Sequence, residues 1–494
     1  MRRRMQYLAF AIAIALGVSS FSFATAVTAA SAKASGSPHL SLGQTSTFSV
    51  QGVSVPGANF QGVSIPATPA KYDKVMVRRF GSPSATNVLI LVPGTVAGAG
   101  DFDIVGPYLA AHVPNLQVWA EMRREGALED NSMLLKVLHG KATPEQAFDY
   151  YLEWIFNRKI TNHYQPLKDA NYQFADQWGL AVAMGDLHNV VNLAREGGRR
   201  TVILGGHSLG GAEASIYAVW DFDGRPGYED LGGIVGIDGD AGPVSTGFFG
   251  QAPVTTASQA QAELSKLAAG SPWLDLMGLG LPWITGPFAE FGALATLKEP
   301  NSPSIMQNSD ILPAELKPPV LPTNEAQFGY AFDAATSPSA LALIHVHSGH
   351  LAASGTPRGW VDDGPTPIED VAFDFAQEPL GPVDWYYPDR LTIDVGAAGS
   401  LTQTPAATVL GLRLYHLSQV DVPMYVIQTS LGGTDNFVAD AAIAYQSASQ
   451  IPSVTVVNRA STYSHLDPLL AAPSHNAFLQ SVVPWIEQLP SYKR

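Results

Sequence analysis

The chain has 494 residues, of which 46% are hydrophobic and 14% charged, so it carries enough apolar surface for a large core and is not a disordered chain. Its formal net charge of -15 at pH 7 argues against nucleic acid as a partner, because phosphates repel an acidic surface. It contains no cysteine, which excludes disulfides and thiolate metal sites.

The first 32 residues have the pattern of a secretory signal peptide. Arginines at positions 2–4 precede the apolar run 7–18, and Ala30-Ser31-Ala32 provides a small-residue cleavage site. An uncleaved membrane anchor is the alternative, but this run is shorter than the ~20 residues that a membrane span needs. We therefore expect a secreted protein, extracellular or periplasmic, without an integral membrane span after removal of the signal.

Residues 33–70 are rich in Ser, Thr, Gly and Pro and are expected to form an N-terminal arm. The arm contains a short echo, because residues 51–56 (QGVSVP) resemble residues 61–66 (QGVSIP). A repeat of this length favours a hairpin or two strand–turn units over a solenoid.

From residue 71 onward, the hydrophobic pattern alternates between strands and helices. Residues 73–80 alternate with the period of a half-buried strand, whereas residues 87–92 are continuously apolar, like a strand covered on both faces. Apolar residues three and four apart predict a helix over 180–194, which Gly197-Gly198 would end. This order predicts a mostly parallel sheet with helices on both faces. Further strands are expected at 116–120, 202–205, 231–237, 422–427 and 454–457.

The stretch VILGGHSLGGA, residues 202–212, places Ser208 in the pattern Gly-x-Ser-x-Gly between a predicted strand and a predicted helix. Glycines on both sides allow a sharp turn that presents the hydroxyl, and the N-terminus of the next helix favours negative charge there. The alternative is a glycine-rich turn with an inert serine. We interpret Ser208 as a nucleophile.

A serine nucleophile needs a histidine base that is oriented by a carboxylate. We prefer His465, in the loop after the last predicted strand, over His475, which lies closer to the terminal helix. For the acid we prefer Asp435, in the glycine turn after strand 422–427, over Asp238, which ends an earlier strand. The chain order Ser208, Asp435, His465 is that of α/β-hydrolases.

Two backbone N–H groups should stabilise the oxyanion. One is that of Leu209, directly after the nucleophile. The other should come from the glycine-rich loop 92–100, where we choose Thr95, with Val96 as the alternative.

These motifs together resemble the α/β-hydrolase superfamily, in particular its secreted bacterial esterase- and lipase-like members. The resemblance covers residues 72–240 and 411–486. It implies an α/β-hydrolase fold whose core comprises 71–240 and 406–494, a serine mechanism and no cofactor. The loop after strand 87–92 begins Pro93-Gly94, where many members have His-Gly.

The segment 241–405 falls between two late strands and is too long for a loop, so we expect an inserted cap. Residues 272–291 carry only Asp275 and Glu290 as charged side chains, and Gly and Pro interrupt them too often for a membrane span. With Trp273 and Trp283, this stretch is interpreted either as an apolar pocket over Ser208 or as the core of the cap itself.

Within the cap, His345, His347 and His350 have the spacing H-x-H-x-x-H, which can bind zinc. A companion metal-binding cluster is not evident, so metal catalysis and a non-catalytic binding role are the less favoured alternatives. The sequence therefore predicts a secreted serine hydrolase that cleaves a small-molecule or lipid carboxylic ester through an acyl-enzyme. Amide hydrolysis and acyl transfer remain alternatives on the same fold.

Overall fold

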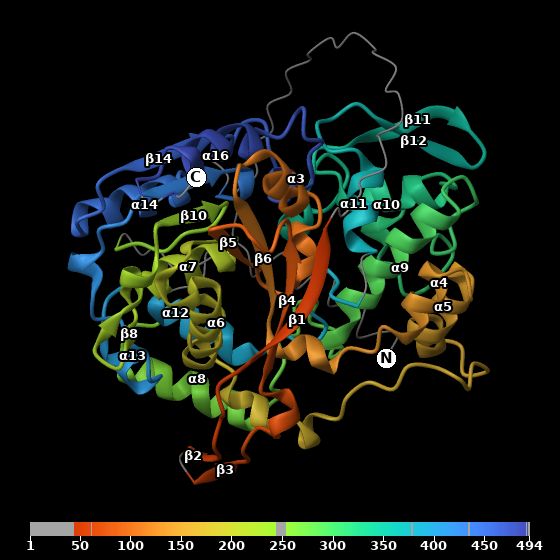
Figure 1. The fold of residues 1–494 in the computed structure, drawn as a ribbon. Helices are drawn as coiled ribbons and strands as arrows, with labels where there is room; N and C mark the ends of the chain where they lie inside the picture. The colour runs from red at the N-terminus through yellow and green to blue at the C-terminus, as the bar shows by residue number, and fades with distance from the viewer. Residues whose placement is uncertain are drawn as a thin grey trace.

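The computed structural model describes residues 44–60, 62–243, 253–376, 379–432, 435–490 and 492. The predicted signal peptide lies outside the described residues. A sheet of eight strands runs through the molecule in the order β1-β4-β6-β5-β7-β10-β13-β14 (Figure 1). The strands are β1 (Thr45–Gln51), β4 (Lys74–Phe80), β5 (Asn87–Val92), β6 (Leu116–Met122), β7 (Thr201–His207), β10 (Gly233–Ile237), β13 (Met424–Gln428) and β14 (Val454–Asn458).

The sheet is parallel except at one edge, where β4 pairs antiparallel with both β1 and β6. The central strand β5 is buried at every position, which agrees with its continuous apolar sequence. The predicted fold class, a mostly parallel sheet covered by helices on both faces, is confirmed.

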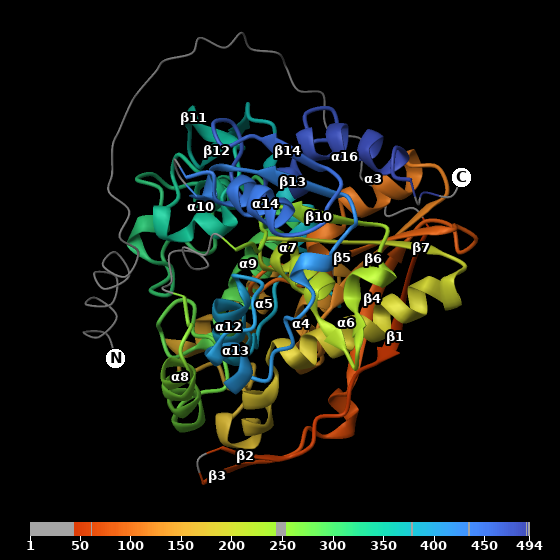
Figure 2. The same cartoon turned by 90° about the vertical axis from the view of Figure 1, so that its left-hand side faces the viewer.

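Helices cover both faces of the sheet (Figures 1 and 2). The side chains of Leu89 and Leu91 pack in one core with α3 (Val105–His112) and α16 (Ala477–Glu487). The alternate side chains, Val88 and Ile90, pack in a second core on the other face. Helices α6 (Leu180–Arg195), α7 (Leu209–Val219) and α14 (Phe437–Ala448) contribute to that second core. Helix α6 ends at Arg195, and Gly197 and Gly198, both with positive φ, follow directly after its cap residue Glu196, as the sequence predicts.

The predicted N-terminal arm contributes a strand to the main sheet. Its residues 45–51 form β1, which pairs with β4 and so becomes the edge strand of the main sheet. The sequence repeat also does not pair with itself. Instead, β2 (Ala58–Phe60) and β3 (Val63–Ile65) form a hairpin in which only β3 belongs to a copy of the repeat.

The insertion between β10 and β13 divides into two groups of elements. One group packs under α6 and contains α8 (Ala257–Ala269), α12 (Asp389–Ala398) and α13 (Pro405–Val409). The other contains α9 (Thr285–Lys298), α10 (Asn324–Phe332), the hairpin β11 (Gly349–Gly355) and β12 (Arg358–Asp362), and α11 (Ile368–Phe375). The second group lies over the carboxyl ends of the strands.

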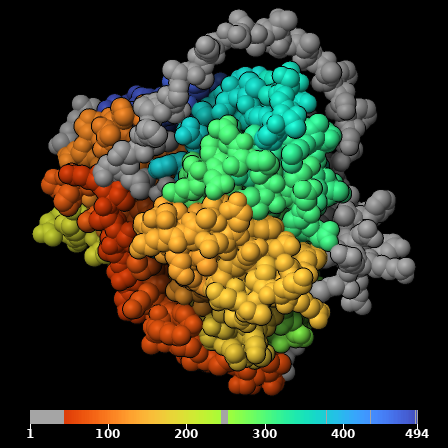
Figure 3. All heavy atoms as spheres, turned by 90° about the vertical axis from the view of Figure 1, so that its right-hand side faces the viewer, coloured from red at the N-terminus to blue at the C-terminus, as the bar shows by residue number. Residues whose placement is uncertain are grey.

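A second excursion, residues 123–179, joins the insertion and was not expected from the sequence. Its helices α4 (Ser132–Leu138) and α5 (Pro144–Tyr151) pack against α9. Figure 3 shows this orange and yellow segment side by side with the green part of the insertion. The remaining short elements are β8 (Asp221–Phe222), β9 (Arg225–Pro226) and α15 (Asp467–Leu470). Over the residues that the structure describes, no helix has the length and apolar character to cross a membrane.

We predict that Gly210→Ala destabilises the protein although alanine favours helices. A Cβ at Gly210, in the first turn of α7, would lie 1.9 Å from the carbonyl oxygen of Val92 at the end of β5. The resulting displacement should cost about 3 kcal/mol of unfolding free energy or more. Gly359→Ala is the matched control, because nothing lies within 4 Å of its Cβ position. Urea unfolding of both variants measures the difference, and equal stabilities would contradict this packing.

Candidate active site

Ser208 lies on a strained turn between β7 and α7. Its backbone has φ 54° and ψ -120°, a conformation that a residue with a side chain adopts only when its surroundings enforce it. Neighbouring backbone atoms leave no room for side chains at the nearby glycines. A Cβ at Gly206 would lie 2.3 Å from the carbonyl carbon of Gly210, and a Cβ at Gly239 would lie 1.8 Å from the backbone carbonyl oxygen of Ser208. The flanking glycines are therefore needed for this turn.

His465 and Asp238 form a buried hydrogen bond beside this turn. His465 Nδ1 donates to Asp238 Oδ2 at 2.5 Å, and both residues are at most 2% exposed. Thr429, directly after β13, donates to the same carboxylate from its backbone N–H, 2.6 Å from Oδ1, and from its hydroxyl. The Asp238 carboxylate is thus fixed from two sides, and it fixes the imidazole ring.

Ser208 and His465 line one cavity. In the described part of the chain, Ser208 Oγ makes no hydrogen bond. Ser208 as a whole is 2% exposed, and it lines this cavity. Hydrogen bonds between catalytic groups are often long without substrate and tighten only when it is bound.

The expected hydrogen bond between Asp435 and His465 is contradicted by the structure. Asp435 is exposed at the start of α14, whereas Asp238 is buried at the end of β10. Strand β10 neighbours β7, and the Ser208 N–H donates to the Ile237 carbonyl at 2.9 Å. The acid that lies next to the serine turn therefore comes from β10, not from β13. His475, the alternative histidine, is exposed.

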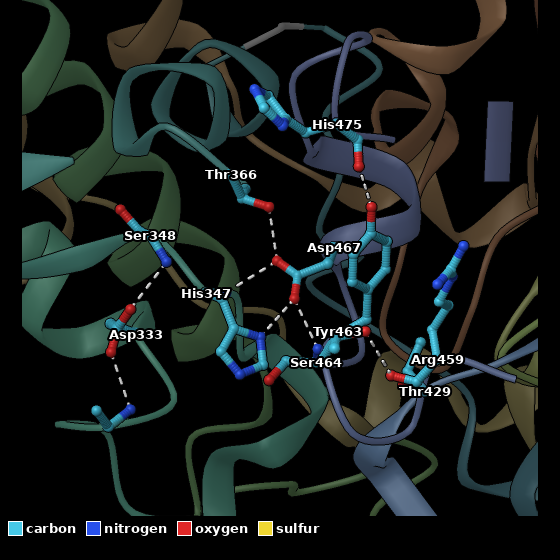
Figure 4. A network of polar contacts seen from close by, with 12 residues as sticks. Asp333, His347, Ser348, Thr366, Thr429, Arg459, Tyr463, Ser464, Asp467 and His475 are labelled. Carbon is cyan, nitrogen blue, oxygen red and sulfur yellow. Dashed lines mark hydrogen bonds and ion pairs between the residues drawn. The ribbon is translucent and has the colours of Figure 1, made fainter. Parts of the chain in front are cut away.

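Asp467 holds the loop that carries His465 (Figure 4). Its Oδ2 accepts from the Ser464 N–H at 2.6 Å and from His347 Nδ1 at 2.7 Å. Its Oδ1 accepts from the His347 N–H at 2.9 Å and from the Thr366 hydroxyl at 2.6 Å. Because His347 and Thr366 belong to the insertion, this carboxylate connects the histidine loop to the cap.

The loop expected to supply an oxyanion donor is pinned by the insertion. Thr95 and Val96 line the cavity, and Val96 has a positive φ of 52°. The segment 381–384 bonds the loop from outside, since Gly98 N–H donates to Pro382 O at 2.9 Å and Asp384 N–H donates to Val96 O at 2.9 Å. The glycine at position 98 thus serves close backbone packing rather than flexibility, because its Cβ would lie 2.2 Å from Gly381 O.

The roles of Thr95 and Leu209 in binding an oxyanion remain predictions. Leu209 is buried as the first residue of α7, directly after Ser208. A Cβ at Gly94 would lie 3.1 Å from Ser208 Cβ, so the loop that carries Thr95 runs directly past the serine. Both backbones are therefore close to the place where an oxyanion would form.

Arg123 is a positioning residue that the sequence reading missed. Its guanidinium donates to the carbonyls of Pro93 at 2.6 Å and Gly94 at 3.2 Å, and to Glu213 Oε2 on α7 at 3.1 Å. Arg123 is 6% exposed. It therefore ties the oxyanion loop to the helix that follows Ser208. The sequence offered one signal for this role: a charged residue directly after the buried strand β6 is expected to need partners inside the protein.

The cavity has a volume of about 180 Å³, and its walls are mostly apolar. The predicted apolar stretch contributes to it, but not through the two tryptophans. Trp273 packs against Trp178 and Tyr386, and Trp283 packs against Tyr164, so both lie where the cap packs against the excursion 123–179. The residues of this stretch and of α9 that line the cavity are Leu276, Met277, Leu279, Ile284, Thr285, Phe288, Ala289, Phe291, Gly292 and Ala295.

The three histidines of the cap do not converge on one point. His345 Nε2 lies 3.2 Å from Pro338 O, His347 binds Asp467, and His350 lies 3.3 Å from Asp363. In the ranges the structure describes, no group of three or more His, Cys, Asp or Glu side chains could hold a metal ion. This geometry does not support the zinc alternative.

A serine on a strained strand-to-helix turn at the carboxyl edge of a mostly parallel sheet, with His465 and Asp238 beside it, is the arrangement of α/β-hydrolases. The chain has the α/β-hydrolase fold. No protein-family model matches the sequence, and no curated protein matches it either.

Solved structures with a similar fold include a candidate lipase from Sulfolobus solfataricus, with 14% identity and a TM-score of 0.45 over 85% of this chain and 91% of that chain. A monoglyceride lipase from Saccharomyces cerevisiae has 9% identity and a TM-score of 0.36 over 89% and 95%. An epoxide hydrolase from Vigna radiata has 12% identity and a TM-score of 0.36 over 89% and 98%. At these identities the likeness concerns the fold and says nothing of the substrate.

The link between His347 and Asp467 predicts a pH-dependent stability. The hydrogen bond to Asp467 raises the pKa of His347 above its usual value. A raised folded-state pKa stabilises the protein fully below the unfolded-state pKa, and this contribution is lost as the pH rises through the folded-state value. His347→Gln should therefore cost more unfolding free energy at about pH 5.5 than at about pH 9.

Urea unfolding of wild type and variant at both pH values measures this difference. In an Asp467→Asn background, His347→Gln should lose its pH-dependent effect, because the carboxylate that favours the imidazolium is gone. A cost of His347→Gln that grows with pH in the wild-type background would contradict the assignment.

Proposed function

We propose that this protein is a serine hydrolase that cleaves carboxylic esters with a lipophilic acyl group through an acyl-enzyme. Ser208 is the nucleophile, His465 the general base and Asp238 the residue that orients the imidazole. The observation that carries the proposal is the buried hydrogen bond of 2.5 Å between His465 and Asp238, with His465 and the strained Ser208 lining one cavity.

The proposed reaction follows from these positions. His465 Nε2 takes the proton of Ser208 while Oγ attacks the ester carbonyl carbon, and Asp238 stabilises the imidazolium that forms. The N–H groups of Leu209 and Thr95 donate to the oxyanion of the tetrahedral intermediate. The carbon–oxygen bond to the alcohol then breaks, and His465 returns the proton to the leaving oxygen. Water attacks the acyl-enzyme in the same way and releases the acid.

The apolar walls support a lipophilic acyl group as substrate. A hydrocarbon chain bound in this cavity removes both its own apolar surface and that of the walls from water. This burial contributes about 0.8 kcal/mol of binding free energy for each buried CH₂. A volume of about 180 Å³ restricts the length of chain that can be enclosed. We infer a secreted location from the N-terminal sequence alone, and N-terminal sequencing of the protein from culture supernatant tests it.

Substitution of the three proposed groups should separate their roles. Ser208→Ala should abolish ester hydrolysis and labelling by a fluorophosphonate, and Asp238→Asn should lower kcat by about 10³–10⁴-fold, since the imidazole loses the partner that fixes its tautomer. The matched control is Asp435→Asn, an exposed carboxylate of the turn before α14. Ester turnover of each variant, with its melting temperature, tests the proposal.

Activity of Asp238→Asn equal to that of wild type would contradict the assigned acid. A fluorophosphonate that leaves the wild-type protein unlabelled would contradict the serine mechanism. Faster turnover of anilides than of matched esters would instead favour an amidase.

A larger side chain in the cavity should shorten the accepted acyl chain. Ala289 is half-buried on α9 and lines the cavity, so Ala289→Phe fills space that a long chain needs. We expect kcat/KM to fall at least about tenfold more for a decanoate ester than for an acetate ester, because each lost methylene contact is worth about 1–3 kcal/mol. An equal loss for both esters would show that Ala289 does not face the acyl chain.

A further inference from the structure

The cavity beside Ser208 contains buried polar atoms that the proposed mechanism does not use. Among the described residues, Asp101 Oδ2, His207 Nδ1 and Thr285 Oγ1 line this cavity and lack a hydrogen-bond partner. Asp101 is 5% and His207 2% exposed. A buried polar atom without a partner costs free energy, so such atoms in a cavity point to a ligand that satisfies them.

Asp101 and His207 form a donor–acceptor pair with a gap between them. His207 Nε2 lies 3.1 Å from the His465 carbonyl oxygen, which can only accept, so Nε2 carries the hydrogen and Nδ1 is left as an acceptor. Nδ1 lies 3.9 Å from Asp101 Oδ2, which is too far for a direct hydrogen bond. One small hydroxyl group between the two could contact both.

The electrostatics of the pair support this assignment. Burial lowers the pKa of His207 well below its usual value, and the neighbouring His465 lowers it further, so the ring is neutral. Burial raises the pKa of Asp101 well above its usual value, against the opposite effect of Arg123. The neighbouring acid, Asp103, is already paired with Arg78. The raised pKa favours the protonated carboxyl group of Asp101, which can donate a hydrogen bond, whereas His207 Nδ1 can accept one.

We propose that Asp101 and His207 bind a hydroxyl group on the acyl part of the substrate, close to the scissile carbonyl. The hydroxyl accepts a hydrogen bond from the Asp101 carboxyl group and donates one to His207 Nδ1. The proposal rests on the proposed ester hydrolysis and narrows its substrate class to esters of hydroxy acids.

The position of the hydroxyl on the acyl chain follows from Gly94. A Cβ on Gly94 would lie 3.1 Å from Ser208 Cβ and 3.6 Å from His207 Nδ1, so Ser208 and the accepting nitrogen of His207 flank the same point. A hydroxyl bound there is only a few bonds from the carbonyl carbon that Ser208 attacks. Carbons 2 and 3 of the acyl chain meet this condition, whereas the far end of a six-carbon chain does not. Because the two partners are fixed in space, one enantiomer should fit better.

The experiment compares ethyl hexanoate with the ethyl esters of 2-, 3- and 6-hydroxyhexanoate, by titration of the acid released. We expect wild type to prefer one enantiomer of the 2- or 3-hydroxy ester over ethyl hexanoate by about tenfold or more in kcat/KM, since a site built to bind a hydroxyl discriminates against an analogue without it. The 6-hydroxy ester should gain no preference. Equal kcat/KM for all four esters would overturn the proposal.

Three variants test which residues cause the preference. In each variant the preference is measured as the ratio of kcat/KM for the hydroxy ester to kcat/KM for ethyl hexanoate. Asp101→Leu should bring the ratio of hydroxy ester to ethyl hexanoate close to one, whereas Asp101→Asn, which retains a donor, should keep part of it. Thr285→Val is the matched control, because it removes another unpaired hydroxyl of the cavity and should preserve the ratio. A preference that survives Asp101→Leu, or one that Thr285→Val alone abolishes, would contradict the assigned pair.

The two proposals fail differently. Hydrolysis of ethyl hexanoate without preference for any hydroxy ester contradicts only the hydroxyl site. Failure to hydrolyse every ester, with no fluorophosphonate labelling of Ser208, contradicts the proposed function and the hydroxyl site with it.

Discussion

The strained backbone at Ser208 is the constraint on which the site depends. A φ of 54° at a residue with a side chain is unfavourable, and the fold maintains it through backbone contacts too close for any Cβ. The contact between Ser208 and Gly239 also fixes the chain directly after Asp238. Asp238 itself has a positive φ of 46°, and its N–H donates to the Ile427 carbonyl of β13 at 2.8 Å. The serine turn and the acid thus form one packed unit across β7, β10 and β13.

The insertion contributes to this unit instead of merely covering it. Its segment 381–384 forms hydrogen bonds with the loop 92–100, and His347 and Thr366 bind the Asp467 carboxylate that holds the loop of His465. The Leu466 N–H also donates to the His345 carbonyl at 3.1 Å. Two loops of the candidate site are therefore shaped by residues far away in the sequence. Movement of the whole insertion as a rigid lid would break these bonds, so it would disturb the site that it encloses.

The sequence predicted those features that arise from local pattern. The strand set, the helix ending at Gly197-Gly198 and the serine turn all depend on neighbouring residues, and a glycine pattern or an apolar period reveals them. The choice between Asp435 and Asp238 depends on which strand end lies next to the serine turn. Both residues follow a parallel strand and reach the same edge of the sheet, so local sequence does not distinguish them. The antiparallel pairing of β1 and the helices of 123–179 are likewise set by tertiary contacts.

Hydrophobic periodicity does not reveal site residues that are charged and buried, although the sequence contains a signal for them. In a chain with only 14% charged residues, Arg123 directly follows a fully buried strand, and Asp101 lies in a loop of glycine and alanine. Arg123 donates to the carbonyls of Pro93 and Gly94 and to Glu213, so it connects the loop 92–100 to α7. Asp101 instead leaves one oxygen without a partner in the cavity. Among the described residues, Arg123 donates to three protein acceptors and leaves only its Nε without a partner, whereas Asp101 leaves Oδ2 for a ligand or water in the cavity that this residue lines.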